Sequence, residues 1–263
     1  MTHRKTAPSE ANDDSTILFV SDAHFGAAPM EQEEERLQRF LAFLRFARGV
    51  DTLYIVGDLF DFWFEYRQVV PKTHAVLLAE IASLARSGVN IHFVAGNHDF
   101  WIGREFAERC GMTPHYESMD LTLQGRRIFL SHGDDLTAGH DTGYRFLRRM
   151  VRNKYAIGLY HWIHPDLAIP FARWASNTSR GYSTAKKFVL NATLERAIRE
   201  KLEGPFDAVV MGHIHYADHL RYETGECLML GDWIQAFTYL ELKDGEFALR
   251  HFEGAEAGVN GDS

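Results

Sequence analysis

The chain has 263 residues, of which 46% are hydrophobic and 24% are charged, and its formal net charge is −8 at pH 7. This length allows one large α/β domain or two small domains with a buried core, and no linker rich in Gly, Ser or Pro divides the sequence. The acidic balance argues against general binding to nucleic acid. We therefore expect one globular domain with no nucleic-acid partner.

The two ends of the chain and its cysteines indicate where the protein works. Residues 1–15 are polar and lack the apolar core of a signal peptide, so they predict a disordered leader. Residues 254–263, rich in Gly and Ala, predict a loose tail, which leaves 16–253 as the single domain. Cys110 and Cys227 have neither the number nor the spacing of a disulfide framework, so a cytoplasmic location is expected.

Five short apolar runs, rich in β-branched and aromatic residues, predict buried strands. They span residues 17–20, 53–56, 91–95, 128–130 and 208–211. A polar motif follows each run: SDAH from Ser21, GDLFD from Gly57, GNHD from Gly96, HGD from His132 and GHIH from Gly212. Any one of these motifs is common in structural turns, but five after predicted strands indicate a shared site.

The segments between the strands predict the fold class. Residues 33–48 and 74–86 have apolar residues at helical spacing, and the acidic start of the first segment suits a helix dipole. Strands that alternate with helices predict parallel pairing, and ligands of such sheets bind at the carboxyl ends of the strands. After Gly204, short strands such as 237–240 and 247–249 predict antiparallel pairing in a second sheet. The expected fold is a four-layer α/β class, a two-sheet β-sandwich flanked by helices.

A helical, aromatic-rich segment at about 141–187 interrupts this pattern and predicts a cap inserted between two of the polar motifs. The overlapping stretch 145–201 carries twelve Lys or Arg against three Asp or Glu, which predicts an anionic partner such as a phosphate or an acidic lipid headgroup. A solvated helix face would also explain these charges, and a helical hairpin or dimer interface would explain the aromatic residues. Pro, His and Asp residues break the most apolar part, so no membrane-spanning segment is predicted.

The motifs contain side chains that bind divalent metal ions. Asp58 follows a glycine at a strand end, where the backbone can turn tightly and direct the carboxylate out of the sheet as a bridging ligand. Asp22 and His24 are two residues apart, as are His213 and His215. In extended backbone both side chains of such a pair would face the same way.

Asn97 and His132 add an amide oxygen and a further imidazole nitrogen to this set. The motifs contain no cysteine, so their donors suit Mn²⁺, Fe²⁺ or Zn²⁺ and do not form a thiolate zinc site. Two divalent ions bring four positive charges, of which Asp22 and Asp58 neutralise two, and the surplus can hold a hydroxide and a phosphate. Because metal binding lowers the pKa of water from about 15.7 towards about 7, the pattern predicts hydrolytic attack on phosphorus.

The motif order resembles that of the calcineurin-like metallophosphoesterases over residues 17–252, with Asp-x-His, Gly-Asp-x-x-Asp, Gly-Asn-His-Asp, a His followed by Gly, and Gly-His-x-His all present. The resemblance implies two metal ions, the first held by Asp22, His24, Asp58 and His215 and the second by Asp58, Asn97, His132 and His213. It also implies that His98 stabilises the phosphate or protonates the leaving group. Asp99 and Asp61 would orient neighbouring imidazole or backbone groups.

Within that family the chain is similar to the UDP-2,3-diacylglucosamine hydrolases of lipid A biosynthesis. The similarity rests on residues 57–63, 96–100, 125–127 and 141–148 and on the cap. It implies Mn²⁺-dependent cleavage of the pyrophosphate of a nucleotide-linked glycolipid, giving UMP and a diacylglucosamine 1-phosphate, at the cytoplasmic face of the inner membrane. The substrate-binding residues that it implies are Asn97, His98, Asp141, Tyr144, Ser176, Asn177, Lys186, Lys187 and His213.

His98 departs from many enzymes of this lipid group, which carry Arg after the motif Asn. Histidine restores the general metallophosphoesterase pattern and could change the substrate preference. Two alternatives therefore stay open: a metallophosphoesterase for another nucleotide, lipid diphosphate or phosphodiester, and a binding module that kept the fold without catalysis. The complete ligand set and His98 argue against the binding module.

Overall fold

The computed structural model describes residues 15–27, 30–66, 69–138, 162–164 and 192–254. Residues 1–14 of the predicted leader, nearly all of the tail and all but residues 162–164 of the predicted cap lie outside these ranges. Ser15 is buried, and its carbonyl oxygen accepts a hydrogen bond from Gln124. Within the described ranges no helix combines the length and the apolar character that crossing a membrane requires.

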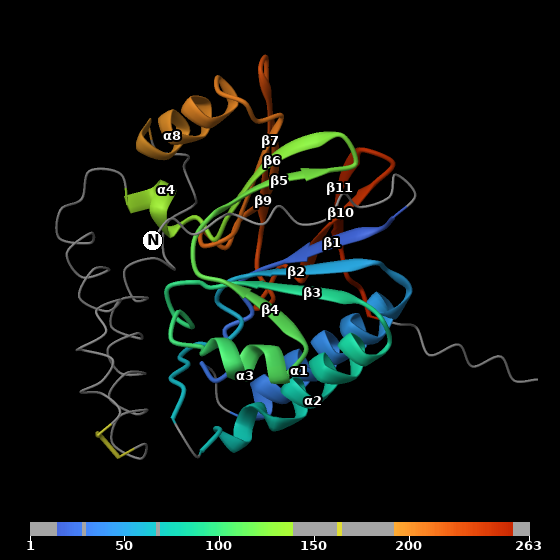
Figure 1. The fold of residues 1–263 in the computed structure, drawn as a ribbon, viewed down its shortest axis with the longest axis vertical. Coiled ribbons are helices and arrows are strands. Elements are labelled where there is room, and N and C mark those ends of the chain that lie inside the picture. Colours follow the sequence, from blue (N-terminus) through green and yellow to red (C-terminus); the bar gives the residue numbers. More distant parts are fainter. Residues whose placement is uncertain (1–14, 28–29, 67–68, 139–161, 165–191, 255–263) are drawn as a thin grey trace, which may run out of the picture.

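Two mixed β-sheets lie face to face (Figure 1). The first sheet has the order β11 (Glu246–His251), β10 (Thr238–Lys243), β1 (Ile17–Val20), β2 (Thr52–Val56), β3 (Asn90–Val94) and β4 (Met112–His115). The second has the order β5 (Met119–Leu123), β6 (Arg126–Ser131), β7 (Ala208–Met211), β9 (Gly225–Leu230) and β8 (Ala217–Tyr222). Strands β1 to β4 are parallel to one another, as are β6, β7 and β9. Parallel strands bring the loops that follow them to one edge of each sheet.

Helices cover the outer faces of the two sheets (Figure 1). The helices on the first sheet are α1 (Met30–Phe46), α2 (Ala75–Arg86) and α3 (Arg104–Arg109), with 3₁₀ turns at Ala47–Gly49 and Lys72–His74. Helices α4 (Asp134–Ala138) and α8 (Ala192–Leu202) cover the second sheet. The described residues therefore form the four layers that the sequence predicts.

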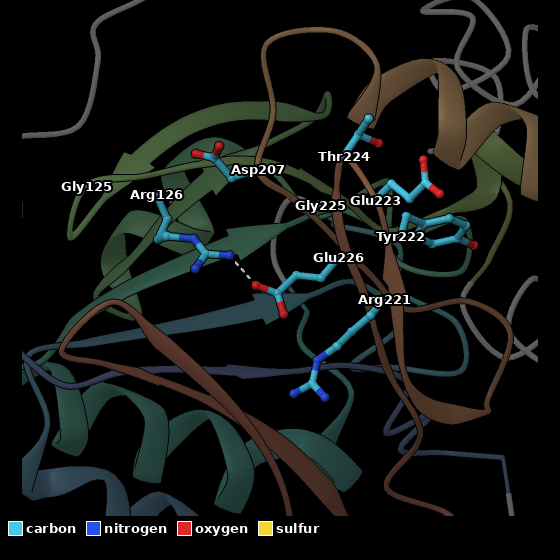
Figure 2. Close-up of a pocket in the computed structure, with 9 residues that line it drawn as sticks. All are labelled: Gly125, Arg126, Asp207, Arg221, Tyr222, Glu223, Thr224, Gly225 and Glu226. Carbon is cyan, nitrogen blue, oxygen red and sulfur yellow. Dashed lines mark hydrogen bonds and ion pairs between the residues drawn. The ribbon is translucent and has the colours of Figure 1, made fainter.

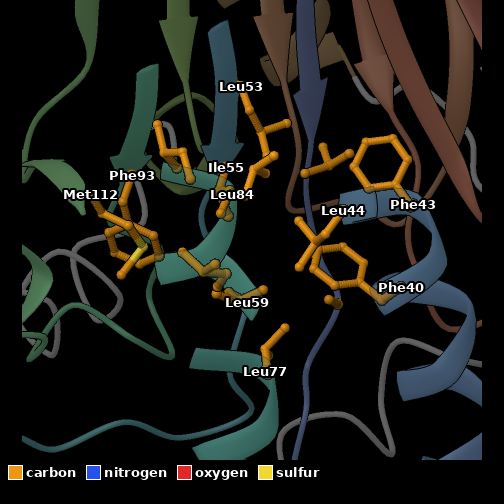
Figure 3. Packing of buried hydrophobic residues seen from close by; sticks show 14 of the residues in the cluster. Phe40, Phe43, Leu44, Leu53, Ile55, Leu59, Leu77, Leu84, Phe93 and Met112 are labelled. Carbon is orange, nitrogen blue, oxygen red and sulfur yellow. The ribbon is translucent and has the colours of Figure 1, made fainter. Parts of the chain in front are cut away.

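Three hydrophobic clusters fill the spaces between the four layers, because successive side chains of a strand point to opposite faces. In β1, Ile17 and Phe19 belong to the cluster between the sheets, whereas Leu18 and Val20 face the helices of the first sheet. Figure 3 shows this second environment, where Phe40 of α1 and Leu77 of α2 pack near the strands. Apolar residues of β6, β7 and β9 meet α4 and α8 in the third cluster. These cores fix both sheets beneath the polar loops.

All five strands predicted from the sequence are present, and the two predicted helices correspond to α1 and α2. The two further strands predicted at 237–240 and 247–249 are also present, but their assignment to the second sheet was wrong. Strands β10 and β11 are antiparallel as expected, but β10 pairs with β1 in the first sheet and not in the second. Leu240 and Leu242 of β10 face the core between the sheets, a position that their alternation fits equally well from either sheet. The sequence pattern therefore sets the burial of β10 without selecting its partner strand.

Candidate metal centre

The five polar motifs meet at one edge of the sandwich. Loops of the first sheet are linked by backbone bonds from Asp22 N to Gly57 O at 3.2 Å and from His24 N to Asp58 O at 2.9 Å. A link between the sheets forms where His213 N donates to Asp22 Oδ2 at 2.8 Å. The carboxyl ends of β1, β2, β3, β6 and β7 thus contribute to a single site.

One cluster of possible metal ligands contains Asp22, His24 and His215. The Nε2 atoms of the two imidazoles are 3.2 Å apart. Asp22 Oδ1 lies 3.7 Å from His24 Nε2 and 3.5 Å from His215 Nε2. Ligands at about 2.1 Å from one ion are separated by about 3.0 Å in octahedral and about 3.4 Å in tetrahedral geometry, so this triangle has the size of a coordination shell.

A second cluster contains Asp58, His132 and His213, with Asn97 beside it. Asp58 Oδ2 lies 3.3 Å from His132 Nε2 and 3.5 Å from His24 Nε2. Asn97 Oδ1 lies 3.1 Å from His132 Nε2. A single carboxylate oxygen therefore faces both clusters, which is the place of a bridging ligand in a dinuclear centre.

The site fits a divalent cation because its nitrogen and oxygen atoms face one another with their lone pairs. His132 Nδ1 donates to Val56 O at 2.9 Å, so the neutral ring directs the Nε2 lone pair at the oxygens of Asp58 and Asn97. Asp22 Oδ1 and His24 Nδ1 are buried, and neither makes a hydrogen bond with the described residues. A cation bound by Asp22 Oδ1 and by the Nε2 lone pair of His24, whose Nδ1 faces Asp61, would replace repulsion between these two atoms with attraction.

Two glycines let the loops approach the carboxylates closely. A Cβ atom at Gly96 would lie 2.1 Å from Asp58 Oδ1, and one at Gly212 would lie 2.5 Å from Asp22 Oδ2. Asp58 Oδ1 also accepts a hydrogen bond from His98 N at 2.9 Å. The loops thus fix one oxygen of each carboxylate and leave the other directed at the imidazoles.

The charges of the site favour ionised carboxylates. Burial by itself raises the pKa of Asp58, but the charges of His132 and His98 hold it well below its usual range. Burial lowers the pKa of His24, and the neighbouring carboxylates Asp22 and Asp61 overcome this and raise it to about 10. The buried carboxylates therefore call for added positive charge, which protons supply in the metal-free protein and metal ions can supply instead.

The backbone brings these side chains together in a way that differs from the predicted one. The expected extended conformation was wrong, because five of the candidate ligands lie in the left-handed region, with φ of 57° at Asp22, 46° at His24, 52° at Asp58, 71° at His213 and 53° at His215. This conformation costs roughly 1–2 kcal/mol per non-glycine residue. Such outliers concentrated at one place are typical of functional sites. Both side chains of each pair still reach the same cluster or neighbouring clusters.

His98 lies beside the two clusters and forms a third group of possible metal ligands with His24 and Asp58. Its Nδ1 is 2.7 Å from Asp61 O, to which it donates, and its Nε2 is 3.9 Å from Asp58 Oδ2. The side chain is 17% exposed, whereas those of His24 and His132 are 1% exposed. His98 therefore has one nitrogen held by backbone and the other directed at the site from its accessible side.

Asp99 supports the loop that carries Asp58, in agreement with the role that the resemblance implies. Its Oδ1 accepts hydrogen bonds from Gly96 N at 2.9 Å and Asp58 N at 3.2 Å, and its Oδ2 accepts one from Leu59 N at 2.8 Å. Burial and the charge of Asp58 raise the pKa of Asp99 to about 7. Asp61 Oδ1 lies 3.6 Å from His24 Nδ1, so it faces an imidazole as expected.

Two residues beside the site were not identified from the sequence. Asp232 Oδ2 lies 3.5 Å from His215 Nδ1, and Arg36 of α1 donates to Ala23 O and to Trp233 O, which ties two site loops together. The signal for Asp232 was available, because Gly231 and Asp232 follow the buried strand β9 as Gly57 and Asp58 follow β2. Nothing in its spacing distinguishes Arg36 from other basic residues of an amphipathic helix.

Six of the predicted substrate-binding residues lie outside the described ranges: Asp141, Tyr144, Ser176, Asn177, Lys186 and Lys187. The described part of the basic stretch favours the solvated-face interpretation for α8. Arg196 pairs with Glu200 at 2.8 Å and Arg199 with Glu195 at 2.8 Å on the helix surface. Trp162, from the predicted cap, is 89% exposed.

A hollow of about 570 Å³ lies at the opposite end of the second sheet, at the start of β6 and in the β8–β9 hairpin. Figure 2 shows Arg126 directed at Glu226, with which it forms an ion pair. The candidate metal ligands are absent from its lining, which is Gly125, Arg126, Asp207, Arg221, Tyr222, Glu223, Thr224, Gly225 and Glu226. This hollow is therefore separate from the candidate metal ligands.

Comparisons with known proteins agree with this geometry. A family model for calcineurin-like phosphoesterases matches residues 15–217. A UDP-2,3-diacylglucosamine hydrolase of Porphyromonas gingivalis is 32% identical over 263 residues, covering 92% of this chain and 99% of that protein. The enzyme of the same name from Aeromonas salmonicida is 34% identical over 244 residues, covering 88% and 91%.

Among solved structures, an archaeal phosphodiesterase has 14% sequence identity and a TM-score of 0.45, covering 89% of this chain and 98% of that one. The family match spans most of the chain and includes all the candidate ligand loops up to residue 217. The chain is a metal-dependent hydrolase, and it belongs to the calcineurin-like phosphoesterase family.

Proposed function

We propose that the site holds two divalent ions. Asp22, His24, Asp58 and His215 would hold the first ion, and Asp58, Asn97, His132 and His213 the second. The observation that carries this assignment is the position of Asp58 Oδ2, within 3.5 Å of His24 Nε2 and 3.3 Å of His132 Nε2. Mn²⁺ is the ion that we propose, with Fe²⁺ and Zn²⁺ as alternatives that the same carboxylate, amide and imidazole donors also suit.

The reaction that we propose is hydrolysis of the pyrophosphate bond of UDP-2,3-diacylglucosamine to UMP and 2,3-diacylglucosamine 1-phosphate. The curated relatives carry the name of this activity and are matched over nearly their whole length. When bound, the two ions supply Lewis-acid charge and lower the pKa of a water molecule, which permits attack on phosphorus at neutral pH. The protein's own groups orient the phosphates and exchange protons.

We propose that His98 stabilises the negative charge of the phosphate or protonates the leaving group. Because Nδ1 donates to Asp61 O at 2.7 Å, Nε2 is the nitrogen that faces the substrate, and it donates to a phosphate or leaving-group oxygen when the ring is in the imidazolium form. The fixed Nδ1 bond orients the ring before the substrate binds, which reduces the reorganisation needed in the transition state. Asn97 and His213 would contact the same phosphate from the second cluster.

The remaining substrate contacts are proposed from the sequence. Asp141, Tyr144, Ser176, Asn177, Lys186 and Lys187 would bind the sugar and phosphates, and the aromatic cap would receive the acyl chains. The basic stretch 145–201 would favour an acidic lipid surface, which supports peripheral attachment to the membrane that contains the substrate.

Hydrolysis in oxygen-18 water tests the reaction and the attacked phosphorus together. Purified protein with Mn²⁺ is incubated with UDP-2,3-diacylglucosamine, and the products are analysed by mass spectrometry. We expect UMP that carries the label. Label in the lipid phosphate would place the attack on the other phosphorus. Hydrolysis of a generic phosphodiester without cleavage of the lipid nucleotide would favour another substrate. His98, which replaces the Arg of many enzymes of the lipid group, is the residue that raises this alternative. No hydrolysis of either compound would favour the binding module.

A further inference from the structure

His215 is more exposed than the other imidazoles of its cluster. Its side chain is 33% exposed, whereas that of His24 is 1% exposed. The ring stacks on His24 with the centroids 4.9 Å apart and the planes at 22°. Stacking alone leaves the ring free to exchange its two nitrogens by rotation, so another contact must select the nitrogen that faces Asp22.

Asp232 provides that contact on the other side of the ring. Its Oδ2 lies 3.5 Å from His215 Nδ1, while His215 Nε2 lies 3.5 Å from Asp22 Oδ1. The imidazole is therefore placed between two carboxylates, one on each nitrogen. A carboxylate accepts a hydrogen bond and donates none, so either carboxylate alone could accept from the ring. When Nε2 binds a metal ion together with Asp22, the ring hydrogen is on Nδ1, the nitrogen that faces Asp232.

The turn around Asp232 is built to hold this carboxylate still. Asp232 is buried, and its Oδ1 accepts backbone hydrogen bonds from Ile234 N at 3.0 Å, Gln235 N at 2.8 Å and Ala236 N at 3.0 Å. Trp233 N donates to Asp22 O at 3.1 Å, which attaches the turn to the loop of another candidate ligand. One oxygen is thus used by the turn, and the other is directed at His215.

We propose that Asp232 is a positioning residue that accepts the Nδ1 proton of His215 and so keeps the Nε2 lone pair directed at the first metal position. This inference rests on the proposed metal assignment and adds a residue that the ligand set does not contain. Carboxylates that accept the second ring proton of a ligating histidine fix its tautomer and increase its basicity.

Asp232→Asn separates the two roles of the side chain. The amide oxygen can still accept the three backbone hydrogen bonds, so the turn is retained. The amide NH₂ replaces Oδ2 and can only donate, which favours the tautomer with hydrogen on His215 Nε2. That tautomer presents no lone pair to the metal. Asp207→Asn is the matched control, because Asp207 accepts a hydrogen bond from Arg127 N at 2.7 Å at the opposite end of the same sheet.

Titration of the metal-free proteins with Mn²⁺, followed by calorimetry, measures the affinity for each ion. We expect Asp232→Asn to weaken the first site about 10- to 100-fold, the range for contacts that support metal ligands. The Mn²⁺ affinity of the second site and the melting temperature should equal those of Asp207→Asn. A variant with normal affinity for both ions, or one that loses both ions and stability together, would overturn the proposal.

Nitrogen-15 NMR of the His215 ring gives a readout that does not depend on folding of the variant. In wild-type protein loaded with the diamagnetic ion Zn²⁺, we expect hydrogen on Nδ1 and the metal on Nε2; metal on Nδ1, or no hydrogen there, would contradict the proposed role. His215→Ala shows whether the metal assignment or only the role of Asp232 is wrong. If this variant binds both ions normally, the metal assignment itself fails. If it loses the first ion while Asp232→Asn does not, only the role of Asp232 fails.

Discussion

The polar groups that meet at the two ends of the second sheet differ in how their charges are balanced. At the start of β6 and β9, opposite charges meet, because Arg126 pairs with Glu226 (Figure 2). At the other end, imidazole nitrogens face each other at 3.2 Å between His24 and His215. The first arrangement pairs a positive with a negative group of the protein. The second places imidazole nitrogens beside buried carboxylates, whose charge protons or metal ions can neutralise, and this is the physical argument for a metal centre.

Backbone conformation shows the same contrast. Eight described non-glycine residues have positive φ, and five of them are candidate metal ligands. Gln124 and Asp244 are two of the others, and each precedes a glycine with positive φ in a hairpin, where such turns are ordinary. No hairpin explains the left-handed residues of the ligand loops. Five of the eight residues therefore lie at the site, two lie in hairpins, and the remaining one, Phe237, directly precedes β10.

Loss of the shared carboxylate should have the largest effect. We expect Asp58→Ala to lower the turnover of a generic phosphodiester by at least about 10³-fold, because both ion positions lose a ligand and their bridge. Steady-state kinetics with saturating Mn²⁺ measure this. Asp207→Ala, which removes an exposed carboxylate at the other end of the second sheet, should retain activity. Wild-type turnover in metal-loaded Asp58→Ala would disprove the bridging role.

His98→Ala should lower turnover by about 10²- to 10⁴-fold, the range for a general acid or a donor to the phosphate, with little change in bound metal. Turnover and metal content are measured on the same sample, the latter by elemental analysis. His251→Ala is the control, because His251 Nδ1 also bonds to a backbone oxygen, Ala236 O at 2.5 Å, on an exposed strand. A large loss of metal from His98→Ala would reassign His98 as a ligand.

Replacement of residues 155–174 by a short Gly/Ser linker tests the proposed acyl-chain chamber. We expect kcat/KM for UDP-2,3-diacylglucosamine to fall at least about tenfold more than that for a UDP-sugar without acyl chains, since each buried methylene contributes about 0.8 kcal/mol. Kinetics on both substrates give the comparison. Equal losses would mean that the segment has a structural role only.

Gly96→Ala tests whether close packing holds the bridging carboxylate. The added Cβ would lie 2.1 Å from Asp58 Oδ1 and 2.5 Å from Asp58 N, so the loop must shift. We expect a loss of about 1–3 kcal/mol in unfolding free energy together with reduced metal content. Urea unfolding measures the first quantity. Gly49→Ala, where no atom lies within 4 Å of the added Cβ, should change stability by less than about 0.5 kcal/mol.

The pH dependence of the metal-free protein gives the smallest predicted effect. The pKa of His24 is raised to about 10 by Asp22 and Asp61, and that of His132 is raised by Asp58, although burial opposes both shifts. Their contribution to stability is complete below about pH 6.5 and is lost as the pH rises through the folded-state pKa. We therefore expect the unfolding free energy to fall by about 1–3 kcal/mol between pH 7 and 10.

Urea unfolding at several pH values checks this expectation. The metal-loaded protein is the control, because deprotonation strengthens metal binding and should offset the loss. A metal-free protein whose stability rises over the same interval would show that the imidazoles are not held protonated by the carboxylates.

The sequence predicts the layers and the ligand loops because each depends on local patterns. Apolar runs such as Ile17–Val20 mark a strand buried on both faces, and a polar motif marks its end. The backbone conformation of Asp22 could not be predicted, since two-residue spacing is equally compatible with extended and left-handed geometry. The partner of β10 depends on the packing of both sheets against each other, which alternation of Leu240 and Leu242 does not encode.

The roles of supporting residues follow from contacts between distant segments. Asp99 lies next to the ligand motif and was identified there. Asp232 lies beyond β9, more than a hundred residues from His98, and its partner His215 is identified only when the turn folds back. Its Gly-Asp pattern after a buried strand was nevertheless readable, and it would have predicted another carboxylate at the same edge of the second sheet.

Anomalous diffraction from a crystal grown with ample Mn²⁺ tests the dinuclear site most directly. We expect two manganese peaks that share Asp58 Oδ2, one beside Asp22, His24 and His215 and the other beside Asn97, His132 and His213. Side chains turned away from one another, with no manganese between them, would contradict the account.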